Sequence, residues 1–375
     1  MATPNLAKPI GARPVAAKAA QADTSQISQG RLMVRRFMQS KLSVFGGIAL
    51  VIMYLLALFA PFFGPYDVNE IDTNYQWSGP STLTFAGGWP GICGVTQTLD
   101  QKNFAWVYTK DCSQSNPIQL FVHGSSYSVL GLFNSDLHLF GVGKPAKIYI
   151  WGADSQGRDI FGRVLMGARV SLSVGLVGVG FSTVLGSILG TASGYFGGII
   201  DNLMQRVIEL ISSIPTLPLY ATIAATLPHD ISVTQRFFLI TVVLSLVTWT
   251  GLARQVRGKV LSYRGADYTS AARLAGASHT RVIMNHMLPN AVSHIIVVAA
   301  LAVPGAILGE TALSFLGLGM LPPAVSWGVL LRDAQQVQVV TTYPWLMIPG
   351  AAVIAAVLCF NLLGDGLRDA VDPYG

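Results

Sequence analysis

Long stretches of apolar residues without charge recur along the chain, separated by shorter polar and basic segments. Spanning a bilayer takes about 20 residues of helix, and a helix satisfies its own backbone where no water is available. Six stretches fit this length, at residues 43–63, 170–200, 210–227, 237–253, 288–309 and 342–364. The pattern predicts an all-α polytopic membrane protein with six transmembrane helices.

Two of these stretches carry local signals. The third contains Pro215 and Pro218, and a proline inside a helix removes a hydrogen bond and bends the helix. Ahead of the second stretch, the apolar residues at 160, 161, 164 and 165 share one helical face, with Arg158 and Arg163 off it. That pattern predicts a short helix lying at the membrane surface before the second span.

Residues 66–166 form the longest segment between two apolar stretches. Apolar and polar residues alternate over 104–108 and again over 118–122, and the second run leads through 123–126 into 127–130. Alternation interrupted by a glycine and serines is typical of a β-hairpin. We therefore expect a small β-rich insertion outside the membrane.

Two of the three cysteines, Cys93 and Cys112, lie in this insertion, and Cys359 lies in the last apolar stretch. On an oxidising face of the membrane the first two can form a disulfide, which would stabilise the insertion by roughly 3 kcal/mol. Two unrelated thiols fit the sequence almost equally well.

Composition and charge support the membrane prediction. Hydrophobic residues make up 51% of the chain and charged residues 11%, where a soluble domain carries about a quarter charged residues. The formal net charge is +6, and basic residues gather before the first stretch and over 254–286. Four predicted spans separate these two segments, so the positive-inside rule places both in the cytoplasm. The basic charge therefore indicates membrane topology and not nucleic-acid binding.

The basic loop between the fourth and fifth stretches contains the run SAARLAG at 270–276. Gly276 is suited to end a helix in the left-handed conformation, Ser278 can cap a second helix, and Pro289 suits the first turn of the next span. We expect two short helices meeting at Gly276, parallel to the membrane surface. The turn is almost bare of side chains, so a partner protein can approach its backbone closely. Packing of this small-residue helix against the chain's own spans is the alternative.

Several polar residues in or near the spans are candidates for a pathway or gating role: Glu209, His294 and Glu310. Each also has a structural interpretation. Glu209 can pair with Arg206 three residues earlier, His294 can be a hydrogen-bonded packing residue, and Glu310 can lie at the membrane interface. The chain lacks a GxxxxGK[ST] phosphate loop and metal-ligand spacings, so we predict no enzyme and no metal site.

Seven further motifs follow one another along the chain. They are DSQGRD at 154–159, GARVSL at 167–172, GYFGG at 194–198, LPN at 288–290, ETALSFLGLG at 310–319, SWG at 326–328 and NLLGDGLRD at 361–369. In this order, they resemble the C-type permease subunits of dipeptide and oligopeptide ATP-binding-cassette (ABC) importers over residues 31–63 and 151–373.

In that family the basic loop is the "EAA" loop, to which a separate ATPase binds. The resemblance assigns this coupling role to Tyr268, Ser270, Ala271, Ala272, Leu274, Ala275, Gly276, Ala277, Arg281, Leu288 and Pro289. Two positions depart from the family pattern, because Ser270 replaces the usual glutamate and His286 replaces an aliphatic residue. The insertion at 67–148 is also longer than is usual in the family.

The resemblance implies an importer with a second, homologous permease subunit, two ABC ATPase subunits and an extracytoplasmic solute-binding protein. ATP and magnesium would bind to the ATPases, and this chain would need no cofactor. The substrate would be a peptide, or, in the same architecture, an oligosaccharide, a metal chelate or a peptide antibiotic. A secondary transporter or channel is the other class, which predicts inverted repeats and buried coupling acids.

These inferences divide the chain into five parts in a bacterial inner membrane, with both termini cytoplasmic. They are a partly disordered tail (1–42), a first transmembrane helix (43–65), an extracytoplasmic insertion with an interfacial helix (66–166), a five-helix core with coupling loop 254–287 (167–365) and a C-terminal tail (366–375).

Overall fold

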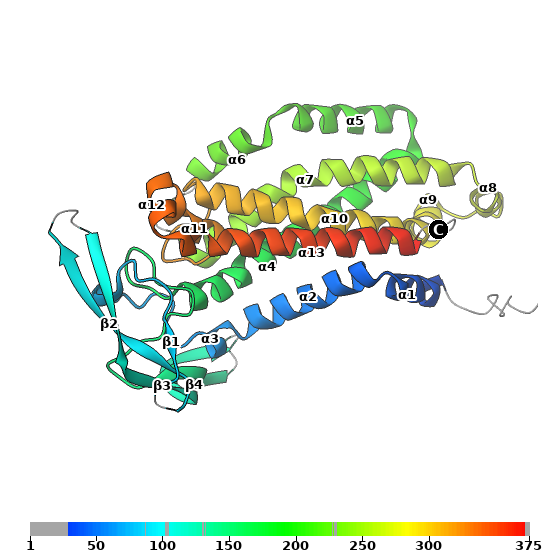
Figure 1. Cartoon of the computed structure of the whole chain (residues 1–375). Helices are drawn as coiled ribbons and strands as arrows, with labels where there is room; N and C mark the ends of the chain where they lie inside the picture. The colour runs from blue at the N-terminus through cyan, green and yellow to red at the C-terminus, as the bar shows by residue number, and fades with distance from the viewer. Residues whose placement is uncertain are drawn as a thin grey trace, which may run out of the picture.

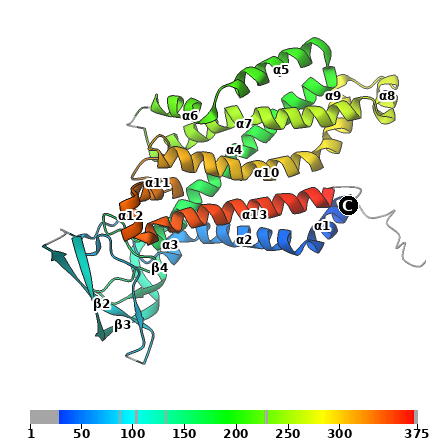
Figure 2. The same cartoon turned by 45° about the horizontal axis from the view of Figure 1, so that its top comes forward.

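The computed structural model describes residues 29–371, except 87, 102–104, 130, 132, 227, 229 and 230. Long helices run side by side along the molecule, and a small sheet lies at one end (Figures 1 and 2). We call this the sheet end and the opposite end, where α1, α8 and α9 lie, the loop end. Of the tail 1–42, which we expected to be partly disordered, residues 1–28 lie outside the described residues, and α1 begins at Gln29.

Helices make up most of the described chain. They are α1 (Gln29–Gln39), α2 (Lys41–Leu58), α3 (Ala60–Phe63), α4 (Ile160–Phe196), α5 (Gly198–Ser213), α6 (Thr216–Ala225), α7 (Val233–Arg264), α8 (Asp267–Leu274), α9 (His279–Val282), α10 (Leu288–Phe315), α11 (Trp327–Leu331), α12 (Val337–Thr342) and α13 (Ile348–Val371).

Five helical stretches in the described part of the chain are long and apolar enough to cross a membrane. They are Lys41–Leu58, Ile160–Phe196, Gln235–Arg264, His279–Phe315 and Pro344–Val371. These confirm five of the six predicted spans.

The remaining prediction, a single helical span over 210–227, is wrong. Helix α5 ends at Ser213, and α6 begins at Thr216. Ile214 between them is extended, with φ −86° and ψ 126°, because Pro215 disfavours the helical conformation of the residue before it. The broken pair still leads from the loop end back to the sheet end (Figures 1 and 2).

The separate surface helix expected at 160–166 is also absent, because these residues form the first turns of α4. Asp159 caps this helix by accepting hydrogen bonds from the backbone N–H groups of Phe161 and Gly162. No proline interrupts the helix, and glycine and alanine lead directly into the predicted span. Helix α4 therefore runs for 37 residues, and Arg163 is buried in it.

The insertion contains a four-stranded antiparallel sheet in the order β1-β2-β3-β4. Its strands are β1 (Leu83–Thr84), β2 (Gly91–Asp100), β3 (Ala105–Val129) and β4 (Phe133–Val142). The hairpin turn expected at 123–126 is wrong, since β3 continues through it and pairs with β4, with a shift of register between His123 and Tyr127. The glycine and serines of this segment form an irregularity within one strand, and such an irregularity bends a strand.

His138 fixes the sheet to the membrane helices. Its ring is buried, and Nδ1 lies 2.9 Å from the carbonyl oxygen of Pro61 and 2.6 Å from that of Gly64, at the end of α3. Its Nε2 lies 3.0 Å from the carbonyl oxygen of Ser125 in the irregular part of β3. One side chain of β4 thus joins two strands to the first span.

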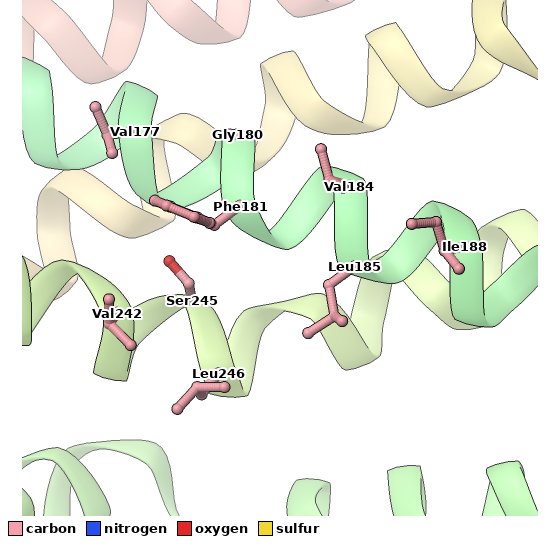
Figure 3. Close-up of a pocket in the computed structure, with 9 residues that line it drawn as sticks. All are labelled: Val177, Gly180, Phe181, Val184, Leu185, Ile188, Val242, Ser245 and Leu246. Atoms are coloured by element: carbon pink, nitrogen blue, oxygen red, sulfur yellow. The ribbon is translucent and has the colours of Figure 1, made fainter.

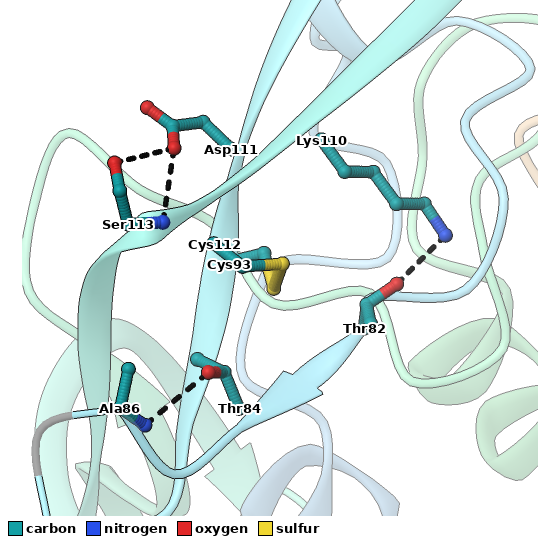
Figure 4. The surroundings of a disulfide bond; sticks show 8 residues. All are labelled: Thr82, Thr84, Ala86, Cys93, Lys110, Asp111, Cys112 and Ser113. Atoms are coloured by element: carbon teal, nitrogen blue, oxygen red, sulfur yellow. Dashed lines mark hydrogen bonds between the residues drawn. A yellow bond between two sulfur atoms is a disulfide. The ribbon is translucent and has the colours of Figure 1, made fainter.

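Cys93 of β2 and Cys112 of β3 form a disulfide in the structure (Figure 4). Lys110 donates a hydrogen bond to the hydroxyl of Thr82 beside it, at 2.7 Å. The third cysteine, Cys359, is free and buried in α13. Of the two alternatives that the sequence left open, the structure contains the bridge.

Helices α4 and α7 approach each other along three glycines four residues apart, which we call the glycine seam. A Cβ atom on Gly186 would lie 2.9 Å from the carbonyl oxygen of Trp249, and one on Gly194 would lie 2.9 Å from that of Arg257. On Gly190 it would lie 2.4 Å from the carbonyl oxygen of Ala253. Because these atoms belong to the backbone, they cannot move aside as a side chain would, and the two helices depend on the absence of a side chain here.

A thiol count tests the disulfide. We expect the purified chain, denatured without reductant, to expose one reactive thiol, that of Cys359, and to expose three after reduction, because the chain has three cysteines. The measurement is mass spectrometry after alkylation in each state. Alkylation of Cys93 and Cys112 in the unreduced sample would contradict the bridge.

Substitution of one glycine tests the seam. We expect Gly190→Ala to destabilise the protein by about 1–3 kcal/mol, because its Cβ overlaps the α7 backbone. Gly180→Ala on the same helix is the matched control, since no heavy atom lies within 4 Å of its added carbon. Thermal unfolding of both variants in detergent is the measurement, and equal melting temperatures would argue against the seam.

Candidate functional site

Helix α8 at the loop end has one inward and one outward face. Thr269 is fully buried, and Ala272 packs on a cluster that includes Val282 and Met287. On the outward face, Tyr268, Ser270, Ala271 and Ala275 are exposed, and the Leu274 side chain is 90% exposed. A leucine so exposed at a helix end is a contact residue available to a partner.

The turn after α8 closes as the sequence predicts. Gly276 has φ +80°, and the N–H of Ala277 donates to the carbonyl oxygen of Ala272 at 3.0 Å, which satisfies the end of the helix. No heavy atom lies within 4 Å of the position of a Cβ on Gly276. The backbone of this elbow is therefore open to a partner.

The first of the two expected helices is α8. It is separate from the span before it, because α7 ends at Arg264 and α8 begins at Asp267. The hydroxyl of Thr269 donates to the carbonyl oxygen of Tyr263 at 2.9 Å. This bond satisfies a carbonyl group at the end of α7 and fixes the angle at which α8 leaves it.

The second half of the loop joins the next span without a break. Ser278 caps α9 by accepting the N–H of Arg281 at 3.3 Å. A π-helical turn, Ile283–Met287, then leads directly into α10, with Pro289 in its first turn. The expected separate second helix is thus the extended start of the fifth span, in which Arg281 is exposed and Leu288 half-buried. π-Helical turns are rare and often occur at functional sites.

Tyr195 at the end of α4 holds both halves of the loop. Its side chain is buried, and its hydroxyl makes a 2.7 Å hydrogen bond with Nδ1 of His279 in α9. Arg273 of α8 donates to the same hydroxyl at 3.4 Å, and its guanidinium lies 5.0 Å from the centre of the Tyr195 ring. Our sequence reasoning used the GYFGG motif only as a family signature. The signal that it missed was the aromatic pair Tyr195 and Phe196. This pair lies near the end of the second apolar stretch, on the side of the membrane where the topology also places the basic loop.

The start of α5 is fixed to α7 beside this tyrosine. Asp201 accepts two hydrogen bonds from Arg257, at 2.5 and 2.6 Å, and a third from Ser193 of α4. Gly197 between α4 and α5 has φ +65°, and a Cβ there would lie 2.4 Å from the Arg264 guanidinium. The GYFGG segment thus joins α4, α5, α7 and the loop in one rigid corner.

A cavity of about 480 Å³ lies among α4, α5, α6, α7 and α10. Its lining includes the hydroxyl groups of Ser182, Thr183, Ser212, Thr216, Thr248 and Thr250. The Thr183 hydroxyl is buried and lacks a hydrogen-bond partner within the described residues. Hydroxyl groups among membrane helices offer donors and acceptors to a polar solute such as a peptide amide.

A second groove, of about 640 Å³, lies between α4 and α7 and is apolar (Figure 3). Phe181 and Leu185 of α4 and Leu246 of α7 line it, and its one hydroxyl, that of Ser245, donates within the bundle to Gly178 and Thr241. The groove offers no polar group to a solute, so the hydroxyl-lined cavity is the better candidate for a peptide path.

None of the three candidate pathway residues is among those that line the hydroxyl-lined cavity in the described structure. Glu209 is exposed and pairs with Arg206 at 2.7 Å, in agreement with its structural interpretation. His294 lies in α10 on another cavity, near the loop end. A pathway role for either residue stays a prediction.

Glu310 is fully buried inside the bundle, and its expected place at the level of the membrane interface stays a prediction. The helix continues beyond it to Phe315, and the hydroxyls of Ser171 and Ser314 donate to its carboxylate at 2.9 and 2.7 Å. The same hydroxyls accept the backbone N–H groups of Trp327 and Met320. Three of the motifs thus meet at one buried carboxylate, which ties α4 and α10 to the segment that leads to α11.

The DSQGRD motif forms a second charged cluster at the sheet end. One carboxylate oxygen of Asp154 accepts a hydrogen bond from Arg158 at 2.7 Å and lies 3.1 Å from Arg163. Burial raises the pKa of Asp159, the cap of α4, to about 7. The described residues contain no group of three or more His, Cys, Asp or Glu side chains placed to hold a metal ion.

Comparison with known proteins agrees with this arrangement. The family described as "Binding-protein-dependent transport system inner membrane component" matches residues 182–374, and "N-terminal TM domain of oligopeptide transport permease C" matches 28–80. The oligopeptide transport system permease protein OppC of Bacillus subtilis is 31% identical over 339 residues, which cover 90% of this chain and 87% of the relative.

Two further relatives match a shorter region at higher identity. OppC of Haemophilus influenzae is 42% identical over 227 residues, 60% of this chain and 70% of the relative. The dipeptide transport system permease protein DppC of Bacillus subtilis is 38% identical over 230 residues, 61% of this chain and 70% of the relative. This chain belongs to the inner-membrane permeases of binding-protein-dependent transport systems, as a C-type subunit of the oligopeptide and dipeptide kind.

Proposed function

We propose that this chain is one permease subunit of an ATP-driven peptide importer and that a separate ATPase drives it through the loop end. The observation that carries the proposal is the exposed elbow of Leu274, Ala275 and Gly276. Its backbone is open, its leucine points away from the bundle, and Tyr195 and Thr269 hold its base in place. ATP and magnesium bind to the ATPase subunits in this proposal.

Force reaches the membrane helices through short, well-packed contacts. A partner that binds α8 moves Arg273 and thereby Tyr195, the penultimate residue of α4. Helix α4 packs on α7 along the glycine seam, so the two helices move as a unit. A close-packed interior transmits such a displacement with little loss.

Ser270 supports coupling without the charge that the family usually has there. Its side chain is exposed on the outward face of α8, beside Ala271 and Leu274. A hydroxyl can accept or donate one hydrogen bond to a partner, and the apolar contact of Leu274 does not depend on charge. Recognition at this elbow therefore relies on shape and apolar contact.

The arrangement supports a cytoplasmic loop end. Helix α1, the α8–α9 loop and the end of α13 lie together at this end, away from the sheet (Figures 1 and 2). With α5 and α6 as a broken third crossing, both termini (1–42 and 366–375) and the loop 254–287 are cytoplasmic, and the insertion 66–166 is extracytoplasmic. The disulfide in the insertion accords with an oxidising side.

The hydroxyl-lined cavity is our candidate for this subunit's share of the peptide path. A second, homologous permease supplies the facing wall, and an extracytoplasmic solute-binding protein delivers the peptide at the sheet end. Hydroxyl groups such as those of Thr183 and Thr216 can bond peptide amides of any sequence. Such contacts suit a carrier of varied peptides better than charged contacts, which select particular side chains.

Placing a charge on the elbow tests the docking surface. We expect Leu274→Asp to reduce co-purification of the ATPase subunits at least tenfold while leaving the chain folded, because this side chain is 90% exposed. Val337→Asp is the matched control, since Val337 is 79% exposed but belongs to α12 at the sheet end. Equal ATPase recovery with both variants would contradict the proposal.

Substitution of Gly276 tests the close approach of the partner. We expect Gly276→Val and Gly276→Asn both to abolish uptake of a labelled tripeptide while the variants still insert in the membrane. Asparagine tolerates a positive φ, so its effect reports the added side chain and not backbone strain.

Gly131→Val is the matched control for strain. Gly131 also has a positive φ, of 73°, and open space at its Cβ position, but it lies in the turn between β3 and β4. Normal uptake by the Gly276→Asn variant would mean that no partner closes on this turn.

A further inference from the structure

A cavity of about 520 Å³ at the loop end lies outside both the coupling elbow and the hydroxyl-lined cavity. Four helices surround it, α1, α7, α10 and α13, and we call it the α1 cavity. Arg36, Lys259 and Arg368 line it from three of these helices, and His294, Ser293 and Asn290 line it from the fourth.

Lys259 and Arg368 bring two cationic side chains to the lining of the α1 cavity. That lining contains no aspartate or glutamate among the described residues. Lys259 lies 5.7 Å from the centre of the Tyr263 ring, an attraction that leaves its charge in place. Cations gathered on low-dielectric walls raise the local concentration of anions, so the cavity suits an anionic ligand.

Apolar side chains also line the α1 cavity: Met33 of α1, Val297 of α10 and Val371 of α13. A soluble anion such as phosphate gains nothing from these side chains, whereas a molecule with an anionic head and a hydrocarbon chain contacts both kinds of lining residue. The lining thus matches the two-part chemistry of a phospholipid.

The position of α1 supports the same ligand. Val34 and Met38 are 63% and 62% exposed, and the helix also carries Arg31, Arg35 and Arg36. A short helix with exposed apolar residues and several arginines is typical of the membrane–water interface. Since α2 begins two residues after α1 ends, the cavity lies where a bilayer has its headgroups.

We propose that the α1 cavity binds the phosphate headgroup of an anionic phospholipid, with an acyl chain against its apolar residues. Arginine can hold two phosphate oxygens at once, and lysine adds a point charge. The bound lipid joins α1 to the three spans. It also lies beside Tyr263, whose hydroxyl donates to the carbonyl oxygen of Asn290 and whose own carbonyl oxygen holds α8 through Thr269.

Native mass spectrometry and thermal unfolding of the purified full chain test this site. We expect phosphatidylglycerol to bind and to raise the melting temperature, and phosphatidylcholine at the same concentration to have a much smaller effect. Lys259→Gln with Arg368→Gln should weaken phosphatidylglycerol binding roughly 30-fold, about fivefold for each charge removed. Both residues are exposed, so the fold should tolerate the change.

The matched control is the double variant Arg254→Gln with Arg281→Gln. It removes two positive charges from the same basic loop, but neither residue lines the cavity, so lipid binding should be unchanged. The conservative variant Lys259→Arg should also retain it. Equal loss in the control pair would reduce the effect to general surface charge and overturn the proposal. If inorganic phosphate stabilised the protein as much as phosphatidylglycerol does, the site would bind a soluble anion. If phosphatidylcholine bound equally well, charge would play no role. Either result would also overturn the proposal.

Discussion

The close contact between α4 and α7 is the interaction on which the rest of the structure depends. It exists because Gly186, Gly190 and Gly194 place no side chain against the backbone of α7. Lipid tails are as apolar as the helices, so the hydrophobic effect does not drive helices together in a bilayer. Close packing is therefore a main source of helix association. The contact aligns the two walls of the hydroxyl-lined cavity. It also places Tyr195, one residue after the seam ends, against His279 of α9.

The family motifs are largely structural in this chain. Glu310 with its serines, Asp154 with its arginines and Tyr195 with His279 are buried networks that fix helix ends to one another. The surface that we assign to the partner is less polar, consisting of Leu274, small residues and an open turn. Rigid networks thus hold a small apolar contact surface in a defined place.

The sequence predicted the features that depend on local chemistry. Long apolar stretches predicted five spans, and a small residue after a helix predicted the left-handed turn at Gly276. It could not predict features that depend on distant partners. The strand β3 passes through residues 123–126 because β4 pairs along it. Glu310 is buried where Ser171 of α4, together with Ser314 of its own helix, donates to its carboxylate. Pro215 indicated a bend in the predicted third span. The sequence did not show that the span would divide there into two separate helices, α5 and α6.

The central claim is that a separate ATPase holds the chain at the elbow after α8. The most direct measurement is crosslinking from Leu274→Cys in intact membranes, in a chain whose other free thiol, Cys359, is buried. We expect a bifunctional thiol reagent to join this position to an ATPase subunit, with labelling only from the cytoplasmic side. Labelling from the outer side, or no ATPase adduct with the assembled complex present, would contradict the account.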